Sequence, residues 1–418
     1  MENFPDHRVK VLNNMPVNDN GDFVLYWMTS YRRVRWNFSL DRSIMWAKRL
    51  NKPLVILEAL KCAHRYACDR FHNFVMDGMK DNLIAVQNSE IAYYPYIEPD
   101  PEASKGLLRE FSFKACVVVT DFFPCFFLPG MTLAGASQVF CRMEQVDSNG
   151  LFPCRESDQV FVSAFSFRRY LQKNLPKYIL EAPVEDPLRR SELRRLKKLP
   201  DNIVQKWPPA SESLLLSEHR DLTKLPIDHK IGLTAIKGGS SQASATLGTF
   251  LNQRLSRYAE ERNHVDHPVT SGLSPYLHWG HISVHEIFWT LMQSENWTDR
   301  RNDNYARYNI VQQDYERFKI NTFSNIMMDV YDGDEDKTVF HYFCCEIVRR
   351  GWFTSYCFQQ CPELQEQYGG QTSEDIVHLT WFLDSRFSRW LWTEEDDMDP
   401  PTVTEKIKRI LGLDICLK

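Results

Sequence analysis

The sequence lacks the hydrophobic runs that a membrane span or a secretion signal would require. Its 418 residues contain no stretch of 18 consecutive apolar residues, so we expect no membrane-spanning helix. The start, Met1 to Asp6, has neither the basic nor the apolar region of a secretory signal. Eleven cysteines, an odd number without such a signal, indicate reduced thiols in a cytoplasmic protein, or in a nuclear one if the source is eukaryotic.

A large excess of charge of one sign is also absent. The net charge of −5 argues against indiscriminate nucleic-acid binding, but phosphate contacts depend on local charge rather than on the sum. The densest basic run is Arg189 to Lys198, and no aromatic residue interrupts it. This pattern favours a solvated helix face, with a phosphate-contacting edge as the alternative. The hydrophobic content of 43% and the length fit a globular protein of two or three domains.

The first half of the chain alternates apolar strands with helices. The predicted strands are 23–28, 53–57, 91–96, 116–120 and 145–147, and the predicted helices are 33–50, 71–83 and 107–113. Continuously apolar strands separated by helices indicate a parallel sheet that is covered on both faces. Such sheets bind ligands at the carboxyl ends of their strands, where we expect Thr29, Glu58 and Asp121. No Gly-x-Gly-x-x-Gly follows the first strand, so an ordinary dinucleotide site is not predicted.

The second half has helical periodicity. Proline-rich segments between 166 and 242 read as a connection, and an amphipathic helix over 241–263 carries Tyr258 on its apolar side. A second helix is expected to begin at Pro275 and continue to Leu291. On it His278, His281 and His285 would share a side, but no further ligand is suitably spaced, so no metal site is predicted. The predicted domains are therefore 1–155 (α/β), 156–240 (interdomain linker) and 241–418 (all-helical).

The most informative segment runs from Thr270 to Leu277, with the sequence Thr-Ser-Gly-Leu-Ser-Pro-Tyr-Leu. It begins as a turn rich in hydroxyl groups. Pro275 suits a first helical turn, because its missing N–H has no partner to lose there. A helix start of this kind offers unpaired N–H groups and a partial positive charge to an anion such as a phosphate.

This segment, with Tyr258 twelve residues upstream, resembles the FAD-phosphate segment of the DNA photolyase/cryptochrome family. The runs Leu25–Met28 and Arg33–Leu40 resemble the first strand and helix of class II-like cyclobutane pyrimidine dimer photolyases. The resemblance extends over about residues 8–297. It implies a Rossmann-like parallel-sheet domain followed by a helical FAD-binding domain. It also implies a set of cofactor-binding residues: Tyr258, Thr270, Ser271, Gly272, Leu273 and Ser274.

The resemblance implies light-dependent repair of cyclobutane pyrimidine dimers by electron transfer from reduced FAD. The expected partner is ultraviolet-damaged DNA, the expected state a monomer without membrane association, and some family members also hold an antenna chromophore. A degenerate photolyase or cryptochrome-like flavoprotein, acting as a sensor or interaction protein, is the alternative. An α/β nucleotide-binding enzyme unrelated to DNA is a third interpretation.

The last third of the chain keeps less of the family pattern. Leu383-Asp384-Ser385-Arg386 resembles the family's Leu-Asp-Gly-Arg run beside the flavin ring, and Trp381 precedes it where the family has Asn. No catalytic residue is assigned, and Asp384, Arg386 and Trp381 are the candidates for the ring end of the site.

Overall fold

The structure is a computed structural model that describes residues 4–64, 66–124, 127–157, 167, 170–171, 173–261 and 269–294. The candidates Trp381, Asp384 and Arg386 lie outside the described residues.

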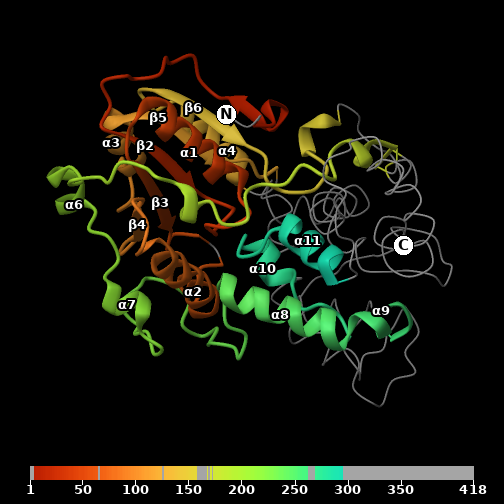
Figure 1. Cartoon of the computed structure of the whole chain (residues 1–418). Coiled ribbons are helices and arrows are strands. Elements are labelled where there is room, and N and C mark those ends of the chain that lie inside the picture. The colour runs from red at the N-terminus through yellow and green to blue at the C-terminus, as the bar shows by residue number, and fades with distance from the viewer. Residues whose placement is uncertain are drawn as a thin grey trace, which may run out of the picture.

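A six-stranded sheet forms the N-terminal half (Figure 1). In chain order its strands are β1 (Val9–Val11), β2 (Phe23–Met28), β3 (Leu54–Leu60), β4 (Ala92–Ile97), β5 (Ala115–Asp121) and β6 (Arg142–Val146). They lie side by side as β1-β6-β5-β2-β3-β4, and only the β1–β6 pair is antiparallel. Trp27 on β2 pairs with both Leu57 on β3 and Thr120 on β5, so the carboxyl ends of these three strands are neighbours. The predicted parallel sheet is confirmed.

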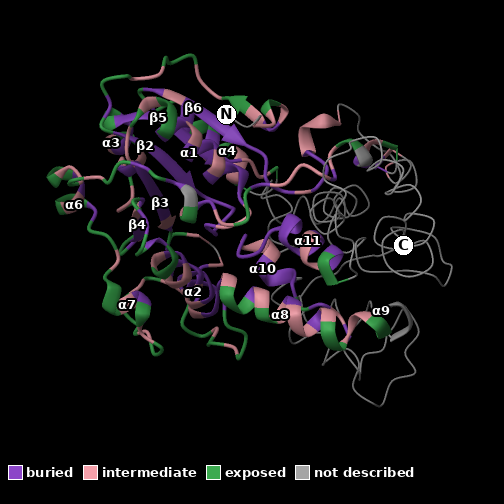
Figure 2. Cartoon of the chain, viewed as in Figure 1, coloured by how far each residue is buried: buried purple, intermediate pink, exposed green. Residues whose placement is uncertain are grey.

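Helices cover the sheet on both faces. They are α1 (Phe38–Leu50), α2 (Asp69–Val86), α3 (Leu107–Lys114) and α4 (Leu128–Ala136). On one face, Phe38 and Leu40 of α1 share a buried cluster with Tyr26. On the other face, Phe111 of α3 shares a second buried cluster with Leu25. The inner strands β2, β3 and β5 are almost entirely buried (Figure 2), as their continuous apolar runs predict.

Several boundaries differ from the sequence prediction. The first helix begins at Phe38, not at Arg33, because the Asn37 side chain caps it by accepting the Ser39 N–H at 2.9 Å. Trp36 just before the cap has a positive φ of 47°, which does not fit a helix. β1 and α4 were not predicted. β1 is a three-residue edge strand, and α4 starts with Leu-Pro-Gly, which reads as a turn.

In the described residues after the sheet, the first two helices pack against the sheet region and the other four share a separate apolar core. They are α6 (Asp201–Lys206), α7 (Glu212–Leu216), α8 (Ser240–Gln253), α9 (Leu255–Glu261), α10 (Ser274–His278) and α11 (Val284–Ser294). Short 3₁₀ turns lie at Asp6–Arg8, Cys154–Glu156, Leu175–Lys177 and Leu188–Arg190. The predicted order, α/β and then all-α, is confirmed within the described residues. None of the helices described up to residue 294 is both long enough and apolar enough to cross a membrane.

Both predicted long helices of this region are interrupted. The helix over 241–263 is divided at Arg254 into α8 and α9. The helix expected from Pro275 to Leu291 is divided between α10 and α11, where Gly280 has a φ of 73°. The three histidines 278, 281 and 285 are therefore not on one helix side. Leu171, Leu175 and Ile179 of the predicted linker pack into the same apolar core as α8 to α11.

Candidate functional site

The loop after β2 is held by a carboxylate at the carboxyl end of β5. Asp121 Oδ2 accepts the backbone N–H groups of Thr29, Ser30 and Tyr31 at 2.8, 2.8 and 2.9 Å. Its Oδ1 accepts the Tyr26 hydroxyl at 2.7 Å, and the Asp121 residue is 1% exposed. The prediction that Asp121 lies at the strand ends is confirmed. Both carboxylate oxygens of Asp121 accept hydrogen bonds from groups of the protein itself, so Asp121 fixes the loop rather than binding a ligand.

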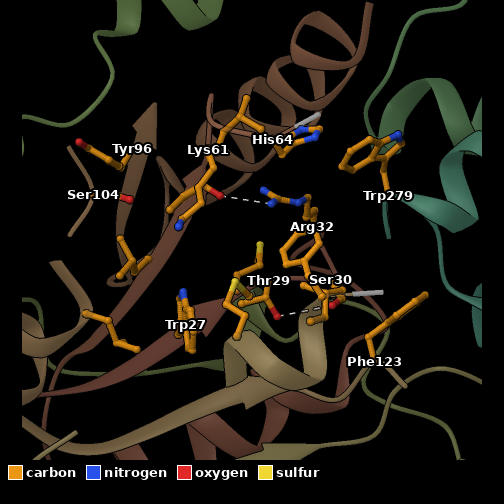
Figure 3. Close-up of a pocket in the computed structure, with 18 of the residues that line it drawn as sticks. Trp27, Thr29, Ser30, Arg32, Lys61, His64, Tyr96, Ser104, Phe123 and Trp279 are labelled. Carbon is orange, nitrogen blue, oxygen red and sulfur yellow. Dashed lines mark hydrogen bonds between the residues drawn. The ribbon is translucent and has the colours of Figure 1, made fainter. Parts of the chain in front are cut away.

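A second buried carboxylate, Glu58 of β3, pairs with Arg32 from the same loop. Arg32 Nη1 lies 2.9 Å from Glu58 Oε1, and Arg32 Nη2 donates to the Ala59 carbonyl at 3.2 Å (Figure 3). Glu58 Oε2 accepts from the Asn82 amide at 2.9 Å and from the Tyr93 hydroxyl at 2.6 Å. Burial, followed by the charge of Glu58, raises the pKa of Tyr93 well above its usual value, so this hydroxyl stays protonated and donates.

A cavity of about 190 Å³ opens where the carboxyl ends of β2, β3 and β4 meet α4 and the end of α10 (Figure 3). Its apolar wall includes Trp27, Leu57, Leu60, Leu107, Leu108, Leu128, Met131 and Trp279, and its polar lining includes Thr29, Ser30, Arg32, Lys61, His64, Tyr96, Ser104 and His278. Among the described lining residues there is no carboxylate. Burial lowers the pKa of His64, which keeps that ring neutral at neutral pH. The cations on the lining are Lys61 and Arg32, and the charge of Arg32 is paired with Glu58.

The segment between α10 and α11 is clamped onto the β2–α1 loop. Arg33 Nη1 donates to the carbonyls of Gly280 at 3.0 Å and Ile282 at 3.4 Å. A Cβ on Gly280 would lie 1.9 Å from the Ser30 carbonyl oxygen, so only glycine allows this approach. The clamp fixes Trp279, which precedes Gly280, at the cavity wall.

His281, directly after Gly280, is fully buried between the sheet region and the helical region. Its Nδ1 accepts the Gly239 N–H at 2.9 Å, and its ring stacks on Phe74 with centroids 5.0 Å apart. Burial, followed by the charges of Arg32 and Arg33, lowers the pKa of His281 to about 3. The ring is therefore neutral. It accepts from Gly239 at the start of α8 in the same helical region, and its stacking on Phe74 of α2 joins that region to the sheet region.

The residues expected at the FAD phosphates lie at the start of α10. Ser271, Leu273 and Ser274 are 2%, 0% and 6% exposed, whereas Gly272 is exposed and has a φ of 69°. Tyr258 of α9 is 4% exposed and shares the buried core with Leu273. Tyr258 and Leu273 therefore belong to the same buried cluster, although they are separated in sequence.

The backbone and the charge around this segment suit an anionic group. The nearest atom to a Cβ on Gly272 would be Thr246 Cγ2 at 3.6 Å, so the backbone is open on that side. No side chain caps the first turn of α10. The Arg254 guanidinium donates to the Thr270 carbonyl at 3.3 Å and brings a positive charge to the segment. An open backbone at an uncapped helix start beside an arginine suits a diphosphate.

Most of the residues that line the cavity were not predicted. Thr29 was expected near a ligand because it follows a strand, but Lys61, His64 and Tyr96 were not singled out as lining residues. Trp279 lies two residues beyond the segment from Thr270 to Leu277, and the tertiary clamp at Gly280 places it at the cavity wall. Helix α4, which supplies Met131, was missed altogether.

Comparison with known proteins gives a consistent set of relatives. No protein-family model matches the chain. The deoxyribodipyrimidine photo-lyase of Methanothermobacter thermautotrophicus is 27% identical over 277 residues, which are 66% of this chain and 57% of that protein. The photo-lyase of Arabidopsis thaliana is 25% identical over 288 residues, 66% of this chain and 55% of that protein. The chain therefore spans little more than half the length of these curated relatives.

A solved structure gives a weaker similarity. The class III photolyase of Agrobacterium tumefaciens has a TM-score of 0.48 and 16% identity, over 75% of this chain and 64% of that one. The architecture described above rests on the strands and helices of this chain alone.

Proposed function

Because the chain belongs to the photolyase/cryptochrome family, we propose that it catalyses light-dependent repair of cyclobutane pyrimidine dimers in DNA, with FAD as its cofactor. The observation that carries the proposal is the similarity to three deoxyribodipyrimidine photo-lyases over about two thirds of this chain. Reduced FAD, when bound, would supply the electron that opens the cyclobutane ring, and the protein would bind, orient and shield it. No general acid, base or nucleophile is required of the side chains.

The start of α10 is the proposed phosphate end of the flavin site. The hydroxyl groups of Thr270, Ser271 and Ser274 and the open backbone at Gly272 would receive the diphosphate. Arg254 supports this assignment because it adds a positive charge beside Thr270. Tyr258 and Leu273 would form the apolar floor, since both are buried in the core below the segment. For the ring end, Asp384, Arg386 and Trp381 remain the proposed candidates.

Ultraviolet-damaged DNA is the proposed substrate, bound by a monomer. A dimerised pyrimidine pair must leave the base stack to reach a flavin, and its weakened pairing lowers the cost of that step. The competing proposal is a flavoprotein of the same family that senses light or binds partners without repair.

The cavity at the strand ends is the proposed binding site of a second, antenna chromophore. Aromatic side chains from β2, β4 and the end of α10 (Trp27, Tyr96 and Trp279) line it, and its charged lining is positive. These features suit a flat aromatic molecule with an anionic group. Replacing Met131 with Trp should fill the cavity and remove any second absorption band from the purified protein, while the flavin bands remain. Retention of that band in Met131→Trp would contradict this assignment.

The absorption spectrum of the purified protein tests the cofactor proposal. We expect the bands of oxidised flavin and the release of FAD on denaturation. A colourless protein that also fails to take up added FAD would contradict the proposal and leave only the ancestry.

A further inference from the structure

A basic segment without regular secondary structure runs over the sheet region. Residues 191–200, here called the basic strap, contain neither helix nor strand and lead into α6 (Figure 1). Leu193 is 8% exposed and packs in the cluster that contains α1. Leu196 and Leu199 pack against the cluster on the opposite face of the sheet. The strap therefore crosses a sheet edge with its leucines turned inward, and its backbone is held by apolar contacts.

The cations of the strap point outward and are not neutralised. Arg194, Arg195 and Lys197 are exposed, and in the part of the chain that the structure describes none of them has a hydrogen bond or an ion pair. Lys198, in contrast, lies 2.6 Å from Asp201 Oδ1. Glu192 is the one carboxylate in the sequence 191–200. Three free positive charges thus lie within four residues of a chain whose net charge is −5.

The length and composition of the strap indicate which polyanion it can bind: duplex DNA, a single strand or a lipid surface. An extended chain rises about 3.3 Å per residue, so Arg194 to Lys197 span at most about 10 Å. Duplex DNA carries one phosphate per about 3.4 Å of axis on each strand, so several phosphates face a segment of that length. Binding to single strands relies on aromatic side chains that stack on bases, and the strap contains none. Binding to a lipid surface relies on exposed apolar side chains, and the three leucines are packed inward.

We propose that the basic strap binds the phosphate backbone of duplex DNA, with no dependence on base sequence or damage. This inference rests on the proposed DNA substrate only for the choice of partner, because the strap uses neither flavin nor lesion. Each phosphate that a cation neutralises contributes about 0.9 to the slope of log K against log salt concentration. The strap therefore adds a salt-sensitive, lesion-independent part to the affinity for DNA.

The test is the salt dependence of binding to an undamaged duplex of mixed sequence, measured in the dark with full-length protein. The variant Arg194→Gln/Arg195→Gln/Lys197→Gln removes the three free charges. The control Lys10→Gln/Lys224→Gln/Lys230→Gln removes the same charge from exposed lysines elsewhere. Unchanged melting temperatures confirm that both variants fold.

We expect the strap variant to reduce the magnitude of the salt slope by about 2–3, and the control to leave it nearly unchanged. Equal slopes for wild type and strap variant would overturn the proposal, as would an equal effect of the control. A strap variant that loses binding to phosphatidylserine vesicles but keeps binding to duplex DNA would also overturn it, in favour of a lipid surface. Failure of dimer repair in light, with this salt effect intact, would contradict the proposed function and leave the strap assignment standing.

Discussion

At the scale of single residues, Gly280 is a point of close approach between the helical region and the loop after β2. An added Cβ would meet the Ser30 carbonyl oxygen at 1.9 Å, and the φ of 73° is itself unfavourable for any side chain. We therefore expect Gly280→Ala to lower the free energy of unfolding by about 2–5 kcal/mol. Urea denaturation measures this change. Gly130→Ala on α4 is the control, because a Cβ there has no atom within 4 Å, and it should be neutral or slightly stabilising.

His281 gives the molecule a predictable response to acid. Its pKa in the folded state is about 3, below the value of about 6.5 in an unfolded chain, so the unfolded state binds the proton first. The stability that His281 contributes is therefore present above pH 6.5 and is lost as the pH falls towards 3. Between pH 7 and pH 5.5 the loss from this residue should be about 1 kcal/mol.

The variant His281→Asn isolates this effect, because asparagine offers an acceptor for the Gly239 N–H but does not titrate in this range. We expect its unfolding free energy to fall by about 1 kcal/mol less than that of wild type over the same pH interval. Identical pH profiles for the two proteins would show that His281 is already protonated or solvated in the folded state.

At the scale of elements, Arg33 ties the loop after β2 to the α10–α11 segment. Its guanidinium donates to the Trp36, Gly280 and Ile282 carbonyls from a residue that is 2% exposed. Arg33→Gln should cost about 2–4 kcal/mol, because buried carbonyls lose charged donors. Hydrogen exchange at the His281 N–H, which donates to the Tyr276 carbonyl at 2.8 Å, should become faster.

Arg35→Gln is the matched control, two residues along the same loop. Arg35 pairs with Glu185 at 3.0 Å, but the two side chains are 43% and 61% exposed. Its removal should change stability by less than about 0.5 kcal/mol. A similar loss of stability and protection in both variants would show that Arg33 does not act as a specific clamp.

The sequence predicted elements well where burial was continuous, as in β2, β3 and β5. It failed where a single residue decides a boundary. The Asn37 cap delays α1, and Gly280 interrupts an apparently continuous helix, because a cap or a positive φ depends on tertiary contacts that no local pattern contains. The candidate site residues show the same difference between local patterns and tertiary contacts. Thr270 to Ser274 were proposed from a motif, whereas the cavity joins residues from six separate elements and leaves no local signal.

At the scale of the whole molecule, the phosphate segment should govern cofactor retention. Ser271→Ala/Ser274→Ala should weaken FAD binding by about 1–3 kcal/mol, because hydroxyl donors to a charged group are lost. Equilibrium titration of the apoprotein with FAD measures this. Ser137→Ala/Ser213→Ala is the control, since both hydroxyl groups are exposed and lie in other elements. Equal FAD affinity in the two double variants would refute the assignment of the segment.

Repair itself tests the central claim most directly. An oligonucleotide that contains a cyclobutane thymine dimer is incubated with the FAD-loaded, reduced protein, and the remaining dimer is quantified after blue light and after an equal time in the dark. We expect loss of the dimer in the light and none in the dark. An intact dimer after illumination of a protein that demonstrably holds reduced FAD and binds the oligonucleotide would contradict it, and would favour a flavoprotein of this family without repair activity.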